Sequence, residues 1–484
     1  MRVIVTSSFV TFLEKILPGK LGSSLLPKLL MLFTIFANKD GEKNAERTAL
    51  VAFSIRIVSA ALAFISQIIL ARSMGEFEYG IFVFVWVFII IAGNLSCLGF
   101  HTVVIRFVPE YNAHNDQSHI RGLTVTARIF AMVLATIIGV IGVAIVVYFE
   151  NKIPDYYLVP IVLGICALPM IALGDVLDGT SRANSWPVIA LSPTYIIRPC
   201  LIIVFVLGSL LFGLQPTAKI ALLAAILASY ITTLGQFVVV TRKLRARYAP
   251  GVRQWELKKW ITVAFPIFII EGFYYLLTNA DVIIVGFFLE PEKVAVYFAA
   301  AKTMALVHFI YFAVKAGAAP KFSAMVAENK MVELDSFAKQ TARWTLLPTI
   351  LIGALVLLLG RFLLSMFGEG FIIGHTVMII LFFGILAKAL IGPGEVLLTM
   401  AGKQRVCMYV YAGALASNLA LNITLIPIFG IEGAALATAS AMTIEAILLF
   451  IVIKSQLGIS MFALGQSNQS HVKSKLSPSR EPLQ

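Results

Sequence analysis

Long apolar stretches without interruption, each near twenty residues, constrain this chain more than any other feature of its sequence. A helix of about 20 residues crosses the hydrocarbon core of a bilayer and satisfies its own backbone hydrogen bonds there. The stretches show no two-residue alternation, which argues against a transmembrane barrel. The twelve predicted spans are 48–71, 79–100, 122–149, 157–177, 189–212, 219–240, 260–288, 294–316, 344–366, 373–400, 407–428 and 431–455.

Composition agrees with lipid as the main solvent of this chain. Of its 484 residues, 59% are hydrophobic and 13% charged, and the mean hydropathy is +0.92. Soluble domains are about a quarter charged. The net charge of +13 is spread over short loops and tails, with no long basic module, so we expect no nucleic-acid partner. The four cysteines lie within or beside apolar runs without close spacing, which predicts neither disulfides nor a metal site.

The basic residues between the spans predict an orientation. With the N-terminus inside, the inner loops carry many cations: Arg106, Arg121, Arg182, Arg242, Lys243, Arg245, Arg247, Arg253, Lys258, Lys259, Lys321, Lys330, Lys339, Arg343, Lys403 and Arg405. The outer loops and their edges carry few: Arg72, Lys152, Lys219, Lys293 and Arg361. Cytoplasmic loops are enriched in Lys and Arg, so both termini are predicted to be cytoplasmic.

The same pattern predicts how the chain is divided. An acidic outer turn recurs in each half, at Met74–Phe82 and at Leu289–Tyr297. An even number of helices per half makes such a repeat parallel, with a pseudo-twofold axis along the membrane normal. We therefore predict an all-α polytopic membrane protein with twelve transmembrane helices in two six-helix lobes. Its predicted parts are an interfacial segment (1–46), an N-terminal lobe (47–240), a basic connector (241–259), a C-terminal lobe (260–456) and a disordered cytoplasmic tail (457–484).

Charged residues inside the spans are the candidate functional groups, because each costs on the order of 3 kcal/mol at bilayer depth. The first span has one polar and small face, and the seventh has another: Arg56, Ser59, Ala63, Ser66 and Gln67, then Glu271, Tyr274, Tyr275, Thr278 and Asp281. In the eighth span, helical spacing places His308, Tyr311 and Lys315 on one face and points Lys302 elsewhere. The fifth and tenth spans contribute Arg198, Lys388 and Glu395.

The sign of these charges suggests their roles. Buried Arg and Lys attract anions, and Arg holds phosphate through its planar fork. Buried carboxylates can take up a proton or Na⁺ when the cavity changes dielectric. An alternative is that residues near span ends, such as Arg72, Lys315 and Glu445, pair locally or reach the interface. Asp281 could equally be a structural partner of a cation.

Several motifs, in this order and spacing, resemble one transporter family. They are Ile69–Phe82, Leu98–Phe100, Arg106–Tyr111, Asn279–Gly286, Glu290–Glu292, Val296–Lys302 and Leu425–Ala437. Together they resemble the oligosaccharide flippases (polysaccharide transporters) of the multidrug/oligosaccharidyl-lipid/polysaccharide exporter superfamily. The resemblance covers about 48–455 and implies a MATE-like fold of two lobes. It further implies a bacterial inner-membrane flippase that exports a polyprenyl-pyrophosphate-linked oligosaccharide, such as an O-antigen, capsule or exopolysaccharide repeat unit.

The resemblance also bears on the site. It implies a lumen rich in Arg and Lys, and the motifs place Lys302 and Asp281 best. The substrate-binding candidates are Arg56, Arg198, Lys302 and Lys315, and the cation-coupling candidates are Asp281, Glu271 and Glu395. We expect no catalytic residues, no metal and no cofactor beyond a coupling H⁺ or Na⁺. Expected partners are the lipid-linked oligosaccharide, membrane lipids and polysaccharide assembly proteins.

Other functions stay open at this point. A cation-coupled multidrug exporter of the same fold would favour a carboxylate-lined cavity that is poor in Arg. A peptidoglycan-precursor flippase would need the same cationic lumen. A membrane-embedded sugar polymerase or ligase commonly needs a large outer loop, and every predicted outer loop is short. A scaffold protein without transport activity is the last alternative, because a fold does not determine a function.

Overall fold

The computed structural model describes residues 43–465, with side chains from residue 55 onward. All regular structure in this range is helical. The predicted interfacial segment falls almost entirely outside the described residues, as does the tail beyond residue 465. The helices are α3 (Lys43–Ser96), α4 (Phe100–Ala113), α5 (Gln117–Tyr148), η1 (Glu150–Lys152), α6 (Asp155–Ile165), α7 (Leu168–Ala183), α8 (Pro187–Ser192), η2 (Pro193–Ile197), α9 (Arg198–Leu211), α10 (Ala218–Arg247), α11 (Leu257–Phe288), α12 (Pro291–Ala305), α13 (His308–Ala327), α14 (Met331–Leu358), α15 (Gly360–Ser365), η3 (Glu369–Gly374), α16 (His375–Ile391), α17 (Gly394–Met400) and α18 (Gln404–Leu457).

By length and composition, eight helices of the described chain could cross a membrane, or ten if two bent pairs each form one span. The eight include α3 and α18, which have 54 residues each. At 1.5 Å per residue each would measure about 80 Å, far more than the ~30 Å hydrocarbon core. Each is broken by a glycine at positive φ, Gly75 (φ 76°) and Gly430 (φ 60°). The predicted twelve crossings require counting both arms of these helices, so the number twelve stays a prediction.

Other predicted spans are also interrupted, three of them at bends or breaks within the lobes. The fourth bends by 43° between α6 and α7, and the eighth bends by 41° between α12 and α13. Pro169 at the start of α7 has no N–H to donate to the preceding turn, which explains the first bend. The tenth span breaks between α16 and α17, where Gly392 has φ 67° and Pro393 follows. Glycine adopts positive φ at little cost, so this pair ends one helix and permits another to start.

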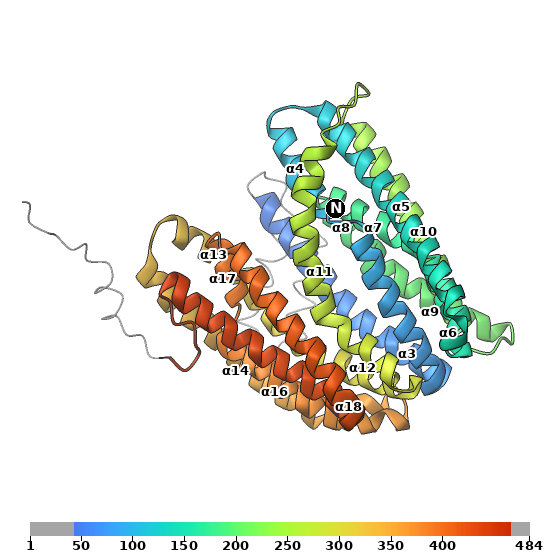
Figure 1. The fold of residues 1–484 in the computed structure, drawn as a ribbon. Helices are drawn as coiled ribbons and strands as arrows, with labels where there is room; N and C mark the ends of the chain where they lie inside the picture. Colours follow the sequence, from blue (N-terminus) through green and yellow to red (C-terminus); the bar gives the residue numbers. More distant parts are fainter. Residues whose placement is uncertain (1–42, 466–484) are drawn as a thin grey trace, which may run out of the picture.

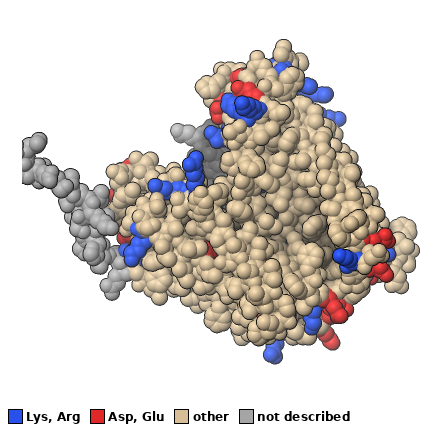
Figure 2. All heavy atoms as spheres, in the orientation of Figure 1, with Lys and Arg blue, Asp and Glu red and all other residues tan. Residues whose placement is uncertain are grey.

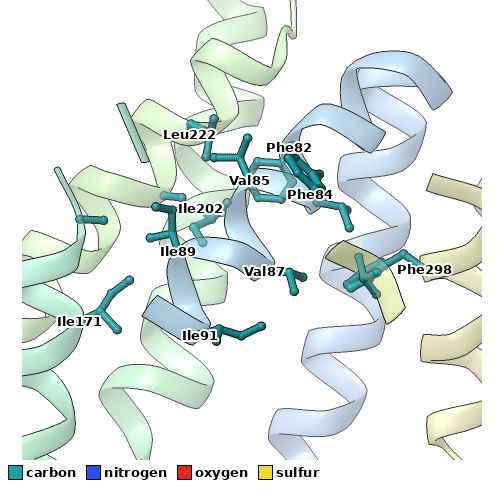
Figure 3. Packing of buried hydrophobic residues seen from close by; sticks show 14 of the residues in the cluster. Phe82, Phe84, Val85, Val87, Ile89, Ile91, Ile171, Ile202, Leu222 and Phe298 are labelled. Carbon is teal, nitrogen blue, oxygen red and sulfur yellow. The ribbon is translucent and has the colours of Figure 1, made fainter. Parts of the chain in front are cut away.

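The helices form two groups, which we call the N lobe (α3–α10) and the C lobe (α11–α18) (Figure 1). The second arm of α3 lies at the centre of the N lobe. Its Ile89 and Ile91 lie near Ile171 of α7, with Ile202 and Leu222 nearby (Figure 3). The connection between the lobes is shorter than the predicted connector, since only residues 248–256 lie between α10 and α11. The predicted domain boundaries themselves stay a proposal.

The helix connections fall at two ends of the molecule. One, which we call the basic end, has the loops at 114–116, 184–186, 248–256, 328–330 and 401–403. Side chains join its N-lobe loops, since Tyr248 bonds to Asn112 and Asn184, and Arg121 donates to the carbonyls of Ala249 and Val252. The opposite end has the turns at Gly75, 149–154, 212–217, 289–290, 359–374 and Gly430.

The predicted alternation of basic and poorly charged loops therefore corresponds to two ends of the structure. Between the charged margins, the face in Figure 2 is nearly free of Lys, Arg, Asp and Glu. Large apolar side chains are exposed along the helices, among them Ile137, Val204, Leu227 and Ile447. An exposed apolar belt of this kind suits contact with lipid tails. The chain is a multi-pass membrane protein.

Candidate functional site: two cavities and their charges

A cavity of about 1140 Å³ lies between the lobes. Its walls come from the first arm of α3, from α4 and η2 of the N lobe, and from α11, α13, α17 and α18 of the C lobe. In Figure 1 the two lobes diverge toward α4 and α13. The lining residues Met400 and Gln404 flank the basic-end loop at 401–403. We call this the central cavity, and in this conformation it opens toward the basic end.

At the opposite end the lobes are packed together. The Tyr79 ring is fully buried and lies 6.4 Å from the ring of Phe298 and 6.1 Å from that of Phe371. The backbones also approach closely, because a Cβ added to Gly80 would lie 1.8 Å from the Pro291 carbonyl oxygen. Arg72 donates hydrogen bonds of 2.7 and 2.8 Å to two carbonyls at the end of α15. These contacts between the lobes close the opposite end.

Two guanidinium groups in the central cavity have no carboxylate partner. Arg56 of α3 lies over the Tyr195 ring, 5.7 Å from its centroid, and Arg106 of α4 lies 5.5 Å from the Phe107 ring. Within the described chain, neither forms an ion pair. Both are exposed to the cavity, so they can offer several N–H donors to an anion.

The carboxylates of the central cavity are both paired. Glu271 of α11 accepts a 2.7 Å hydrogen bond from Thr102 and lies 3.1 Å from His101 Nε2, which joins the C lobe to α4. Glu395 of α17 lies 3.2 Å from Lys315 Nζ. Lys315 neutralises Glu395, and the two arginines outnumber the remaining carboxylate Glu271, so the cavity is cationic.

A second cavity, of about 340 Å³, lies inside the C lobe among α11, α12, α13, α16, α17 and α18. Its cations are Lys302, Lys315 and Lys388, and Lys388 is paired with Glu445 at 2.8 Å. Asp281 is buried in its wall, where it accepts a 2.6 Å hydrogen bond from Tyr297 and a 2.9 Å bond from the Val282 N–H. We call this the C-lobe cavity.

The structure places the predicted site residues as follows. Arg56 and Glu271 line the central cavity, Lys302 and Asp281 line the C-lobe cavity, and Lys315 and Glu395 line both. Arg198 lines neither and is buried at the start of α9, with no hydrogen-bond partner for its Nε atom. The functional roles assigned to all seven stay predictions.

One expectation about direction was wrong. A straight eighth helix points Lys302 away from His308, Tyr311 and Lys315, yet all four line the C-lobe cavity. The reason is the 41° bend between α12 and α13, which changes the helical phase across residues 306–307.

Sequence reasoning also missed several charged residues. Asp175 and Asp178 of α7 lie close enough to His101 to act on its charge. Asp175 falls inside the predicted fourth span, so the search for charges within spans could have found it. His101 and Arg106 lie on α4, an amphipathic helix between the second and third predicted spans, where a search for charges within spans does not reach. In the described part of the chain, no three His, Cys, Asp or Glu side chains are placed to hold a metal ion.

Two family models match the sequence. The model described as "Polysaccharide biosynthesis protein" matches residues 46–326, and the model MatE matches residues 266–424. No curated protein matches the chain.

Solved structures of the same fold cover most of the chain at low identity. One is an inward-facing multidrug resistance MATE family transporter of the MOP superfamily (TM-score 0.67, 15% identity, 85% of this chain and 98% of that chain). Another is the lipid II flippase MurJ in an inward closed conformation (TM-score 0.65, 16% identity, 84% and 87%). A third is a MOP superfamily transporter from Pyrococcus furiosus (TM-score 0.58, 14% identity, 87% and 96%). These likenesses show the fold.

Proposed function

The chain belongs to the polysaccharide biosynthesis protein family, and from this premise we propose that it is a flippase for a polyprenyl-pyrophosphate-linked oligosaccharide. The carried unit is an O-antigen, capsule or exopolysaccharide repeat unit. The observation that supports this most strongly is the central cavity, which is large and has two arginines without carboxylate partners.

The size of the cavity suits a sugar headgroup. Pockets for small ligands measure about 300–1,000 Å³, and the central cavity measures about 1140 Å³. Tyr195 and Tyr411 add aromatic surface to its walls. Such rings have apolar faces and hydroxyl groups, which suit the two kinds of surface on a sugar.

The charge of the cavity suits a pyrophosphate. An anionic group meets a large desolvation penalty in hydrocarbon, and fixed cations that replace its hydration offset that penalty. Arg56 and Arg106 can each bind phosphate oxygens with a planar pair of N–H donors. The lipid tail would stay in the bilayer while the headgroup occupies the cavity.

The route follows from the two ends. By the positive-inside rule, the basic end faces the cytoplasm, with both termini on that side, in a bacterial inner membrane. The conformation described above then receives substrate from the cytoplasm. Release requires the lobes to separate at the opposite end and close at the basic end, which is alternating access around a fixed site. Asp281, Glu271 and Glu395 are the carboxylates we propose for H⁺ or Na⁺ coupling.

Two alternatives share the fold. A multidrug exporter for cationic compounds is disfavoured by the unpaired arginines, because like charges repel in a desolvated cavity. A peptidoglycan-precursor flippase needs the same anion-binding chemistry, so only substrate comparison separates it from our proposal.

The test is transport by the purified full chain in liposomes. A labelled polyprenyl-pyrophosphate trisaccharide is placed in the inner leaflet, and its appearance outside is followed with a membrane-impermeant reagent. We expect transport by the wild type, a rate at least tenfold lower for Arg56→Ala with Arg106→Ala, and no change for Arg405→Ala, which removes an exposed cation from the first turn of α18. Lipid II and a cationic dye are run in parallel. Transport of either in place of the oligosaccharide would replace our proposal with the corresponding alternative.

A further inference from the structure

The boundary between the two cavities contains one ion pair. Five residues line both cavities, and we call them the neck: Phe309, Phe312, Lys315, Glu395 and Tyr411. Lys315 Nζ lies 3.2 Å from Glu395 Oε1. An ionic group in the central cavity can therefore contact this ion pair without entering the C-lobe cavity.

The two members of the pair differ in access. The Lys315 side chain is 39% exposed, and that of Glu395 is 7% exposed. An anion in the central cavity can thus reach the ammonium group, while the carboxylate stays buried behind it. The second carboxylate oxygen of Glu395 accepts a hydrogen bond from Tyr311, which is also buried.

Both helices that carry the pair are discontinuous near it. Lys315 lies on α13, after the 41° bend that follows α12. Glu395 is the second residue of α17, directly after the break at Gly392 and Pro393. Breaks of this kind allow one segment to move without the rest of its helix. The ion pair and the Tyr311 bond are side-chain links between these two segments.

Among residues 55–465, whose side chains the structure describes, no other cation near Glu395 is available to replace Lys315. The charged and titratable groups that face it are Lys315 and Tyr311 of α13, Lys388 of α16, and Cys407, Tyr411 and Glu445 of α18. Of the two lysines, Lys388 is already bound to Glu445 at 2.8 Å. Removing Lys315 from Glu395 would therefore leave a buried carboxylate with a tyrosine hydroxyl as its remaining direct partner.

We propose that the Lys315–Glu395 pair is an exchange site that couples binding of a diphosphate to uptake of one proton. This inference rests on the proposed function and specifies how the same site is regulated. A diphosphate oxygen takes the place of Glu395 at Lys315 Nζ, so one ion pair breaks and another forms. The freed carboxylate accepts one proton from water of the open central cavity and becomes a neutral acid, because a buried unpaired charge is strongly disfavoured.

The exchange has a consequence for transport. The loaded protein holds one additional proton together with the anionic headgroup, so this proton is carried with the substrate from the basic end toward the opposite end. When the diphosphate leaves, Lys315 can bind Glu395 again and the proton is released. The ion pair between α13 and α17 is thereby broken in the loaded state and restored in the empty state, while the hydrogen bond from Tyr311 remains as the other link.

The experiment measures proton uptake on binding. The purified full chain in lipid nanodiscs is titrated calorimetrically with farnesyl diphosphate in two buffers of different ionisation enthalpy. The probe's own protons contribute equally for every variant and cancel in differences. We expect the wild type to take up about one proton more per bound probe than Glu395→Gln, whose side chain keeps the size and the acceptor oxygen.

A second variant keeps the test independent of one substitution. In Lys315→Met the carboxylate lacks its cation before the probe arrives, so we expect proton uptake as low as in Glu395→Gln. The affinity should also fall about tenfold through loss of one charge-assisted bond. Lys315→Arg should keep the uptake, as should Glu110→Gln, which removes an exposed carboxylate of α4 outside both cavities.

The outcomes separate this inference from the proposed function. If Glu395→Gln binds the probe and takes up as many protons as the wild type, the exchange site is refuted and the flippase proposal stands. If the wild type binds no probe and moves no labelled oligosaccharide, the proposed function fails and the exchange site fails with it.

Discussion

The closed opposite end depends on the absence of a side chain at Gly80, and the substitution Gly80→Ala tests this. A Cβ there would lie 1.8 Å from the Pro291 carbonyl oxygen, whereas real Cβ contacts are essentially never below 3.0 Å. To accommodate it, α3 and α12 must separate by about 1.2 Å, which is the difference between these two distances. The obstacle is backbone, which cannot rotate away as a side chain can. Overpacking of this kind costs about 1–3 kcal/mol.

That cost applies only to the conformation in which this end is closed. A free energy of about 1–3 kcal/mol shifts an equilibrium between two conformations about 5- to 150-fold. We therefore expect Gly80→Ala to favour conformations with the opposite end open. The higher helix propensity of alanine acts in both conformations and cancels.

Distances between spin labels provide the assay. Labels are attached at Asp155 of the N lobe and Glu369 of the C lobe, both exposed at the opposite end, after the four native cysteines are replaced by serine. Gly80→Ala should add or enlarge a longer-distance population. The matched control is Gly208→Ala on α9, where a Cβ has no atom within 4 Å. An unchanged distribution in Gly80→Ala, or the same change in the control, would refute the reasoning.

Two further predictions concern stability, measured by thermal unfolding in detergent. Glu445 is buried and lies 2.8 Å from Lys388 Nζ, so Glu445→Gln should destabilise the protein by about 3–5 kcal/mol. The double variant Lys388→Met with Glu445→Leu leaves no unpaired charge and should recover most of the lost stability. Equal losses of stability in the two variants would contradict this prediction. Hydrogen bonds from Ser118, and then from His119, lower the pKa of Asp116 to about 2. Because this pKa is depressed in the folded state, the stabilisation is present above about pH 4 and is lost as the pH falls toward 2. Asp116 also caps α5, so Asp116→Ala should cost about 1 kcal/mol at pH 7, with a smaller cost at pH 3; a cost independent of pH would count against the assignment.

Much of the fold could be predicted because the length of an apolar run is a local property of the sequence. The fold class and the gathering of basic loops at one end followed from it. The bends did not, since the phase change between α12 and α13 has no proline to indicate it and yet decides where Lys302 points. Likewise α4 is too short and too polar to be a span, so His101 and Arg106 fall outside the predicted spans.

The pairing of charges was the least predictable part of the site. Glu395 and Lys315 are 80 residues apart, and nothing local indicates that they meet. A charge inside a predicted span also need not line a cavity, since Arg198 is buried away from both cavities. Helix periodicity gives a direction relative to one helix, whereas lining a cavity depends on how all the helices pack.

The central claim is that this protein carries lipid-linked oligosaccharide across the membrane. The most direct measurement is the leaflet distribution of that lipid in cells that lack the protein, with rescue by the wild type and by Arg56→Ala and Lys302→Ala at matched expression. We predict that the lipid accumulates on the cytoplasmic leaflet without the protein, that the wild type restores export, and that Arg56→Ala and Lys302→Ala do not. Normal arrival of the lipid at the outer leaflet in cells without the protein would contradict the account.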